Sequence, residues 1–183
     1  MIRRYKNLLF GIIIGLLLGI GYSELYDINR WSRFKTDSEN IQICFTPPSG
    51  CTEFIAKQIE QSQESIYLQA YGLTSKVIID ELIEASRRGV KVKAILDRSN
   101  FSEKKSVVEN LRRAGIEVIR DKVLGIAHNK IIILDKITVV TGSFNFTEAA
   151  DKRNSENVVV IHDKKIAEKY MNNWVIREKL SRY

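Results

Sequence analysis

The sequence is poor in the residues that build metal centres. Its 183 residues include two cysteines and two histidines, and the histidines, His128 and His162, lie far from both cysteines in the chain. Structural zinc sites take four such ligands at short spacings, and no group of acids or histidines has the spacing of another divalent-cation site. The sequence therefore predicts neither a metal centre nor a bound cofactor.

Proline is equally scarce, and both prolines lie between Cys44 and Cys51 in the stretch CFTPPSGC. Adjacent prolines and a glycine make the chain turn there. A disulfide closing this small loop fits an exported protein, because disulfides persist in oxidising compartments. Two free thiols, one of them packed under a sheet, are the alternative.

A long apolar run, Leu8 to Ile20, stands at the N-terminus. It contains no charged side chain, it follows three basic residues, and the tripeptide Gly21-Tyr22-Ser23 comes next. This order is typical of a secretory signal peptide. We expect residues 1–23 to be that signal, residues 24–43 a polar linker, and residues 44–183 the catalytic domain.

The same run has an alternative interpretation. It is shorter than the roughly 17–25 apolar residues of a bilayer span, yet an uncleaved N-terminal anchor remains open. The first interpretation predicts a secreted protein, and the second predicts one anchored to the outer face of the inner membrane. Both place the remainder of the chain outside the cytoplasm.

The chain has a modest basic excess. Its formal net charge is +7, and three of these charges fall in the first seven residues, which leaves 7 − 3 = +4 for the remainder. Such an excess fits a polyanionic partner, either nucleic acid or an anionic membrane. It also fits an ordinary basic surface, so charge alone does not choose between them.

Helical and strand periods alternate from Thr52 onward. We expect helices over 52–64, 75–88, 102–114 and 163–180, and strands over 65–73, 90–96, 116–119, 128–134, 137–143 and 156–162. The strands are apolar on both sides, which predicts an α/β fold with one mixed sheet covered by helices on both faces. No internal repeat is present, so one domain per chain is expected.

An imidazole and an ammonium, those of His128 and Lys130, stand at the start of an apolar strand. A two-residue turn at Asp135-Lys136 would place Lys130 opposite Thr141 and His128 opposite Ser143. Asn145 follows on the same face. These four side chains should therefore gather at one end of a hairpin, with Asp135 about 23 Å away at its other end.

The spacing His128-x-Lys130, Asp135, Gly142-Ser143-x-Asn145 resembles the motif of the phospholipase D superfamily. From Cys44 to Trp174 the chain is similar to small bacterial members with a single motif, among which are exported phospholipases and metal-independent endonucleases. The resemblance implies the phospholipase D fold and phosphodiester cleavage through a covalent phosphohistidine. It implies that no metal is needed, because a lysine supplies the positive charge.

The resemblance also implies roles for individual residues. His128 would be the nucleophile, Lys130 and Asn145 would hold the phosphate oxygens, and Ser143, next to Gly142, would add a donor. Among three acids that follow the motif, the resemblance favours Glu156 over Glu148 and Asp151 as the orienting partner of His128. Asp135 is included among the family's active-site residues, although the hairpin geometry favours a structural role in fixing a turn.

The chain carries one copy of a motif that the superfamily uses twice. His162 begins a second His-x-Lys without the remaining residues, and we interpret it as a surface or helix-cap residue. The second catalytic histidine must then come from another chain, which predicts a symmetric homodimer.

Three functions follow from this interpretation. The first is an exported phospholipase D acting on phospholipids such as phosphatidylcholine at a membrane, and the second is a metal-independent endonuclease acting on nucleic acid. The third is an inactive membrane-anchored binding protein, against which the intact motif argues. The segments YGLTS and DRSNFSEKKS follow strands and should border the cleft.

Overall fold

The computed structural model describes residues 40–101 and 107–182. The expected signal or anchor at residues 1–23 lies outside the described residues, as does the linker up to residue 39. In the described part of the chain, no helix is both long enough and apolar enough to span a bilayer.

The described residues form one mixed seven-stranded sheet in the order β1-β7-β6-β5-β2-β3-β4. The strands β2, β3 and β4 run parallel to one another, and the remaining neighbours are antiparallel. The strands are β1 Ile41–Thr46, β2 Ser65–Ala70, β3 Lys91–Leu96, β4 Glu117–Arg120, β5 Lys130–Leu134, β6 Thr138–Gly142 and β7 Glu156–His162.

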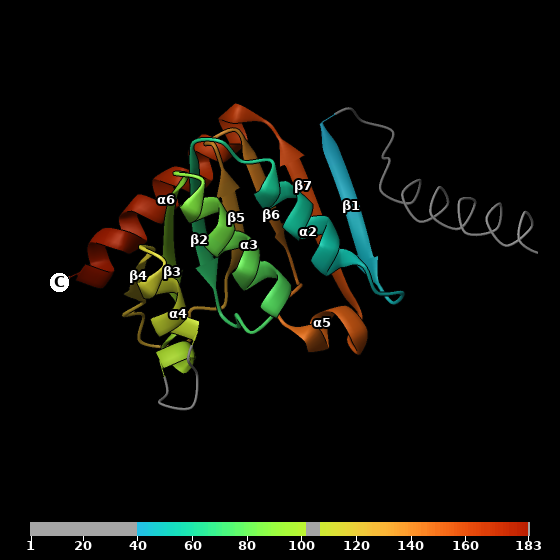
Figure 1. The fold of residues 1–183 in the computed structure, drawn as a ribbon, viewed down its shortest axis with the longest axis horizontal. Helices are drawn as coiled ribbons and strands as arrows, with labels where there is room; N and C mark the ends of the chain where they lie inside the picture. Colours follow the sequence, from blue (N-terminus) through green and yellow to red (C-terminus); the bar gives the residue numbers. More distant parts are fainter. Residues whose placement is uncertain (1–39, 102–106, 183) are drawn as a thin grey trace, which may run out of the picture. The chain divides into compact units, whose positions relative to one another are not determined.

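Helices cover both faces of this sheet, which confirms the predicted α/β class. Figure 1 shows α2, α3 and α4 in front of the sheet and α6 behind it. The helices are α2 Cys51–Glu60, α3 Lys76–Arg87, α4 Val107–Arg113, α5 Glu148–Lys152 and α6 Lys164–Arg182, with a 3₁₀ turn at Arg98–Phe101.

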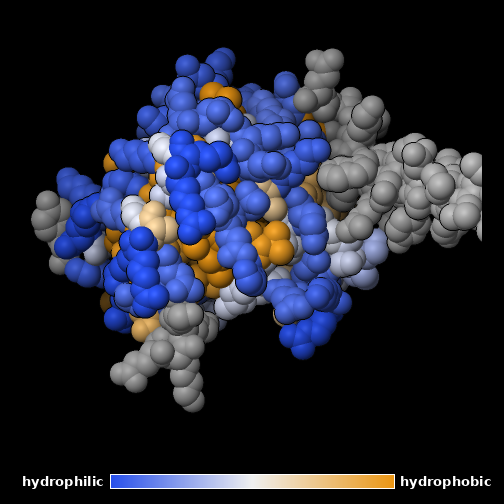
Figure 2. Space-filling model, in the orientation of Figure 1, coloured by the Kyte–Doolittle hydropathy of each residue, from blue (hydrophilic) through white to orange (hydrophobic). Residues whose placement is uncertain are grey.

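Alternation along the strands divides the core between the two faces. On one side, Tyr67, Ile133 and Val139 pack against Ala167 and Trp174 of α6. The other side packs against the front helices, whose outer surface is largely hydrophilic with hydrophobic residues visible between them (Figure 2). Each helix thus buries one apolar face, as the helical spacing predicts.

Two boundaries differ from the sequence-based expectation. Residues 41–43, expected in the linker, belong to β1, an edge strand that pairs with β7. The short helix α5 was not expected. Cys44 of β1 and Cys51 of α2 form a disulfide with a Cα–Cα distance of 5.8 Å, so the structure adopts the bonded alternative.

The register of the β5–β6 hairpin also differs. Leu134 pairs with Thr138, and Ile131 pairs with Thr141, so the predicted pairing of Lys130 with Thr141 is wrong by one residue. Asp135 and Lys136 form the turn with positive φ values, and Ile137, which is 50% exposed, belongs to the loop rather than to β6. The strand β5 starts at Lys130, so His128 precedes it.

Candidate active site

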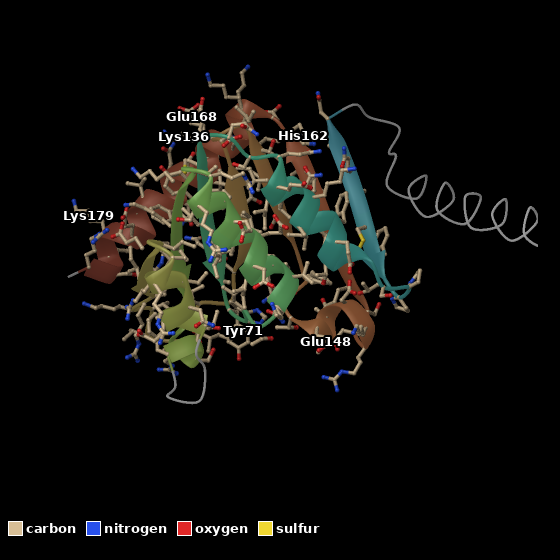
Figure 3. All side chains as sticks on the ribbon, in the orientation of Figure 1. Tyr71, Lys136, Glu148, His162, Glu168 and Lys179 are labelled. Atoms are coloured by element: carbon tan, nitrogen blue, oxygen red, sulfur yellow. A yellow bond between two sulfur atoms is a disulfide. The ribbon has the colours of Figure 1, made fainter. Side chains whose placement is uncertain are left out.

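The residues of the motif meet at one edge of the sheet. The carboxyl ends of β2, β3 and β6 reach this edge, as do the amino ends of β5 and β7, because β5 and β7 run opposite to their neighbours. Tyr71 and Glu148 lie at this edge in Figure 3, whereas Lys136 and His162 lie at the other. The topology therefore gathers side chains from five strand ends.

Lys130 is a buried lysine without a carboxylate partner. Only 7% of it is exposed, and its Nζ donates to the backbone oxygen of His128 at 2.8 Å. None of the ion pairs formed by the described residues includes it. Burial lowers the pKa of Lys130 below its ordinary 10.5, and the charge of Glu156 opposes this only in part.

The ring of Tyr71 joins Lys130 to His128. The Nζ of Lys130 lies 5.4 Å from the centroid of that ring, and the imidazole of His128 meets the ring edge to face at 4.7 Å between centroids. His128 is exposed, and within residues 40–101 and 107–182 its imidazole makes no hydrogen bond. The histidine is thus held by its backbone and by an aromatic contact, with its ring nitrogens free.

Gly142 lets β6 approach β7 closely at this edge. It has a φ of +147°, and a Cβ atom there would lie 2.2 Å from the backbone oxygen of Asn157. That oxygen accepts the backbone N–H of Ser143 at 3.2 Å. A larger residue would push the strands apart, so glycine is required where the motif has it.

The hydroxyl and the backbone N–H of Ser143 both donate hydrogen bonds within the protein. Its hydroxyl donates to Glu156 at 2.5 Å and accepts the backbone N–H of Asn157 at 3.1 Å. The other carboxylate oxygen of Glu156 accepts from Asn154 at 2.9 Å. The structure therefore places Glu156 on Ser143 rather than on His128, and Ser143 supports the site instead of presenting a free hydroxyl.

The other two acids considered as partners of His128 are also engaged elsewhere. Glu148 pairs with Lys152 on the surface of α5 at 2.6 Å. Asp151 is buried and accepts the backbone N–H groups of Gly50 and Thr52.

Asn145 brings to the site a side-chain amide that forms no hydrogen bond with the described residues. Its Oδ1 is buried, and neither Oδ1 nor Nδ2 has a partner among the described residues. The side chain packs 3.7 Å from the position that a Cβ of Gly72 would occupy, next to Tyr71. A buried amide left unpaired costs about 1–3 kcal/mol, so this residue is poised for a ligand.

Two buried residues that the motif does not include fix the backbone of the site. The carboxylate of Asp97 accepts the backbone N–H of Ala127, the residue before His128, at 2.9 Å. Asn100 donates to the backbone oxygen of Tyr71 at 2.7 Å and accepts the N–H of Leu73 at 3.2 Å. The described parts of both segments expected to border the cleft, residues 71–75 and 97–101, thus lie at this edge, and residues 102–106 lie outside the described residues.

Asp135 lies at the opposite end of the hairpin from Lys130. Its carboxylate accepts from the hydroxyl of Ser62 at 2.7 Å and from three backbone N–H groups, those of Gln63, Glu64 and Ser65. Burial would raise the pKa of Asp135, but these hydrogen bonds together hold it below its ordinary 3.8. The turn that Asp135 fixes is the α2–β2 connection.

His162 is the last residue of β7, on the far edge. Its Nδ1 lies 2.9 Å from the hydroxyl of Thr138. The cap of α6 is the next residue, Asp163, which accepts the N–H groups of Lys165 and Ile166. His162 therefore cannot reach the Tyr71 edge in this chain.

A metal-binding group is not found in the described ranges. Within residues 40–101 and 107–182, no three side chains of the His, Cys, Asp or Glu type gather closely enough to hold an ion. The positive charge at the site is that of Lys130.

Comparisons with known proteins agree with this geometry. A family profile described as "Cardiolipin synthase, PLD-like domain" matches residues 55–174. A phospholipase D of Rickettsia bellii is 47% identical, with 96% of each chain covered. Another, of Rickettsia conorii, is 56% identical over 84% of this chain and 74% of that protein.

A solved structure shares both sequence and fold. Nuc, a phospholipase D family member from Salmonella typhimurium, is 35% identical with a TM-score of 0.71, and the match covers 76% of this chain and 94% of that one. The matching residues include the strand ends that form the site. The chain therefore belongs to the phospholipase D superfamily, and it is a phosphodiesterase of that family.

Proposed function

We propose that this phosphodiesterase is an exported phospholipase D that hydrolyses phospholipids such as phosphatidylcholine to phosphatidic acid and the free head group. The observation that carries the proposal is the buried, unpaired ammonium of Lys130 beside the exposed ring of His128. An uncompensated buried cation is costly. A phosphate diester would supply the missing negative charge.

The first step is attack by a neutral ring nitrogen of His128 on phosphorus. A nitrogen–phosphorus bond forms, and the bond from phosphorus to the head-group oxygen breaks. Lys130 and the amide nitrogen of Asn145 stabilise the non-bridging oxygens as negative charge develops there. Both donors are available because no acid among the described residues forms an ion pair with Lys130, and no described residue forms a hydrogen bond with Nδ2 of Asn145.

The leaving alkoxide needs a proton, and this chain offers one histidine at the site. We propose that the partner subunit's His128 donates it across a twofold axis. The same group then takes a proton from water as the water attacks phosphorus. The nitrogen–phosphorus bond breaks, phosphatidic acid leaves, and His128 is restored. The position of His162 on the far edge supports a second chain as the source.

The proposal includes export of the enzyme from the cytoplasm. The basic and apolar order of residues 1–23 supports secretion or anchoring on the outer face of the inner membrane. The Cys44–Cys51 disulfide supports an oxidising compartment.

The decisive experiment assays phosphatidylcholine vesicles and plasmid DNA in parallel, both in EDTA. We expect choline release by the wild type, and a loss of roughly 10³-fold or more in His128→Asn, because the nucleophile is gone. His162→Asn is the matched control and should keep wild-type activity. DNA nicking without choline release would refute the lipid assignment.

A metal-independent endonuclease is the second candidate. Its specific support is the 35% identity to Nuc over 76% of this chain, together with the net charge of +7. The same assay tests it, since nicking in EDTA that disappears in His128→Asn would establish it. If neither substrate is cleaved, the remaining candidate is an inactive membrane-anchored binding protein.

A further inference from the structure

The loop between β4 and β5 carries an exposed apolar tip. Leu124 is 99% exposed, Ile126 is 53% exposed and Val123 is 38% exposed, and open space surrounds Gly125. No other described segment exposes three large apolar side chains within four residues. We call residues 123–126 the apolar loop.

Buried carboxylates hold both ends of this loop. At its start, Asp121 accepts the N–H of Val123 at 2.9 Å and forms an ion pair with Arg177 of α6. At its end, Asp97 accepts the N–H of Ala127 at 2.9 Å. The ends are fixed while Leu124 at the tip is almost fully exposed, so the protein holds this apolar side chain out in solvent.

The apolar loop lies beside the catalytic histidine. Ile126 precedes His128 by two residues, and both belong to the edge where β4 ends and β5 begins. Exposed cations flank it, since Arg120 and Lys122 precede the loop and Arg98 follows Asp97 in the chain. Apolar side chains flanked by basic ones suit the boundary of a bilayer, where the apolar side chains meet acyl chains and the basic side chains meet phosphates.

We propose that the apolar loop inserts into the lipid surface and brings the active site to the phosphates of the bilayer. The inference rests on the proposed lipid substrate and specifies how that substrate is reached. A diester phosphate in a bilayer lies just outside the hydrocarbon, so a site at the edge of the sheet must dock at that depth. Leu124 and Ile126 supply the burial that holds it there.

The direct test uses tryptophan as a depth probe in the full chain. Leu124→Trp should be quenched by vesicles of brominated phosphatidylcholine and phosphatidylglycerol beyond the quenching seen in the wild type. Ile137→Trp is the matched control, because Ile137 is 50% exposed in the turn at the opposite edge. Equal quenching of both variants, or none of Leu124→Trp, would overturn the proposal.

A kinetic test separates docking from chemistry. In the double variant Leu124→Ser/Ile126→Ser, hydrolysis of vesicle phosphatidylcholine should fall roughly tenfold or more. Hydrolysis of the soluble diester bis(4-nitrophenyl) phosphate should stay at the wild-type rate, which also shows that the variant folds. Ile137→Ser should leave both rates unchanged.

The outcomes distinguish this proposal from the function on which it rests. If the wild type cleaves the soluble diester but no phospholipid, while Leu124→Trp is still quenched, the proposed function fails and the docking loop stands. If sedimentation shows that the double variant changes from dimer to monomer, the apolar loop is a contact between copies, and the membrane proposal is overturned.

Discussion

At the scale of single residues, the site depends on an ammonium that the protein itself leaves unneutralised. Lys130 donates to a carbonyl and lies over the ring of Tyr71, and neither contact supplies a negative charge. Its lowered pKa follows from this burial. The charge of Glu156 acts on Lys130, but no carboxylate among the described residues forms an ion pair with it, so the ammonium is left to bind an anion.

The lowered pKa predicts how activity depends on pH. As pH rises through the pKa of Lys130, below 10.5, the lysine loses its proton and kcat/KM on a soluble diester should fall. In Lys130→Arg the guanidinium stays charged up to about pH 12, so this alkaline limb should disappear. The activity of this variant should be lower at every pH, because the planar guanidinium differs in shape from the lysine ammonium. The measurement is a pH profile of both proteins.

An exposed lysine provides the comparison. Lys136 lies in the turn at the far edge (Figure 3), and Lys136→Arg should reproduce the wild-type profile. An alkaline limb that persists unchanged in Lys130→Arg would show that another group titrates.

At the scale of elements, Asp135 ties the β5–β6 turn to the connection between α2 and β2. One carboxylate accepts three backbone N–H groups and the hydroxyl of Ser62. The motif therefore extends to both ends of the hairpin for different reasons. One end carries the residues of the proposed chemistry, and the other fixes the turn that joins β5 to β6.

Replacing Asp135 should reduce stability without reducing catalysis per folded molecule. We expect Asp135→Ala to lower the free energy of unfolding by about 2–3 kcal/mol in urea titrations, since charged hydrogen bonds are lost. Lys136→Ala, in the same turn, should have little effect. A loss of kcat larger than the loss of folded protein would indicate a direct role for Asp135.

The pH dependence of this effect has a defined sign. The folded-state pKa of Asp135 is depressed, so its contribution is fully present above the unfolded value of about 3.8 and is lost as pH falls through the folded value. The stability difference between wild type and Asp135→Ala should therefore narrow in acid.

Local patterns predicted the elements that bury a regular face. Ile78, Leu82 and Ala85 are all buried, and the helix expected at 75–88 is found at Lys76–Arg87. The strand β1 was missed because its partner, β7, is distant in the chain. The hairpin register was missed because turn geometry, with positive φ at Asp135 and Lys136, decides it.

The residues of the candidate site also fall into two groups, those that the sequence predicted and those that it did not. Spacing within one hairpin was sufficient to predict that His128, Lys130 and Asn145 gather at one edge of the sheet. It could not select Tyr71, Asp97 or Asn100, because these residues follow other strands and meet the hairpin only when the sheet forms. Long-range pairing supplies the residues that fix the site.

At the scale of the whole molecule, one motif per chain makes the proposed active site a property of two chains. The described part of each chain presents one edge with the imidazole of His128, the ammonium of Lys130 and the amide of Asn145. In the proposed mechanism the proton donor comes from a second chain. A dimer of this kind would have no activity as a monomer.

Mixing subunits tests this directly. If wild type and His128→Asn are co-refolded, a mixed dimer holds one His128 and lacks either donor or nucleophile. Activity should follow the square of the wild-type fraction, so an equal mixture keeps about one quarter of the activity. Mixing with His162→Asn should cost nothing. A linear fall, to about one half, would show that each chain works alone.

The Cys44–Cys51 bond also has a mechanical consequence. The strand β1 is an edge strand that follows Asn40. Tension on the preceding segment would first break the hydrogen bond from the backbone N–H of His162 to the oxygen of Asn40, and would then peel β1 from β7 one pair at a time, starting at Ile41. Peeling reaches Cys44 after three residues, and there the covalent link passes the load to α2. A tethered enzyme would therefore be held by a helix packed in its core rather than by the edge of its sheet.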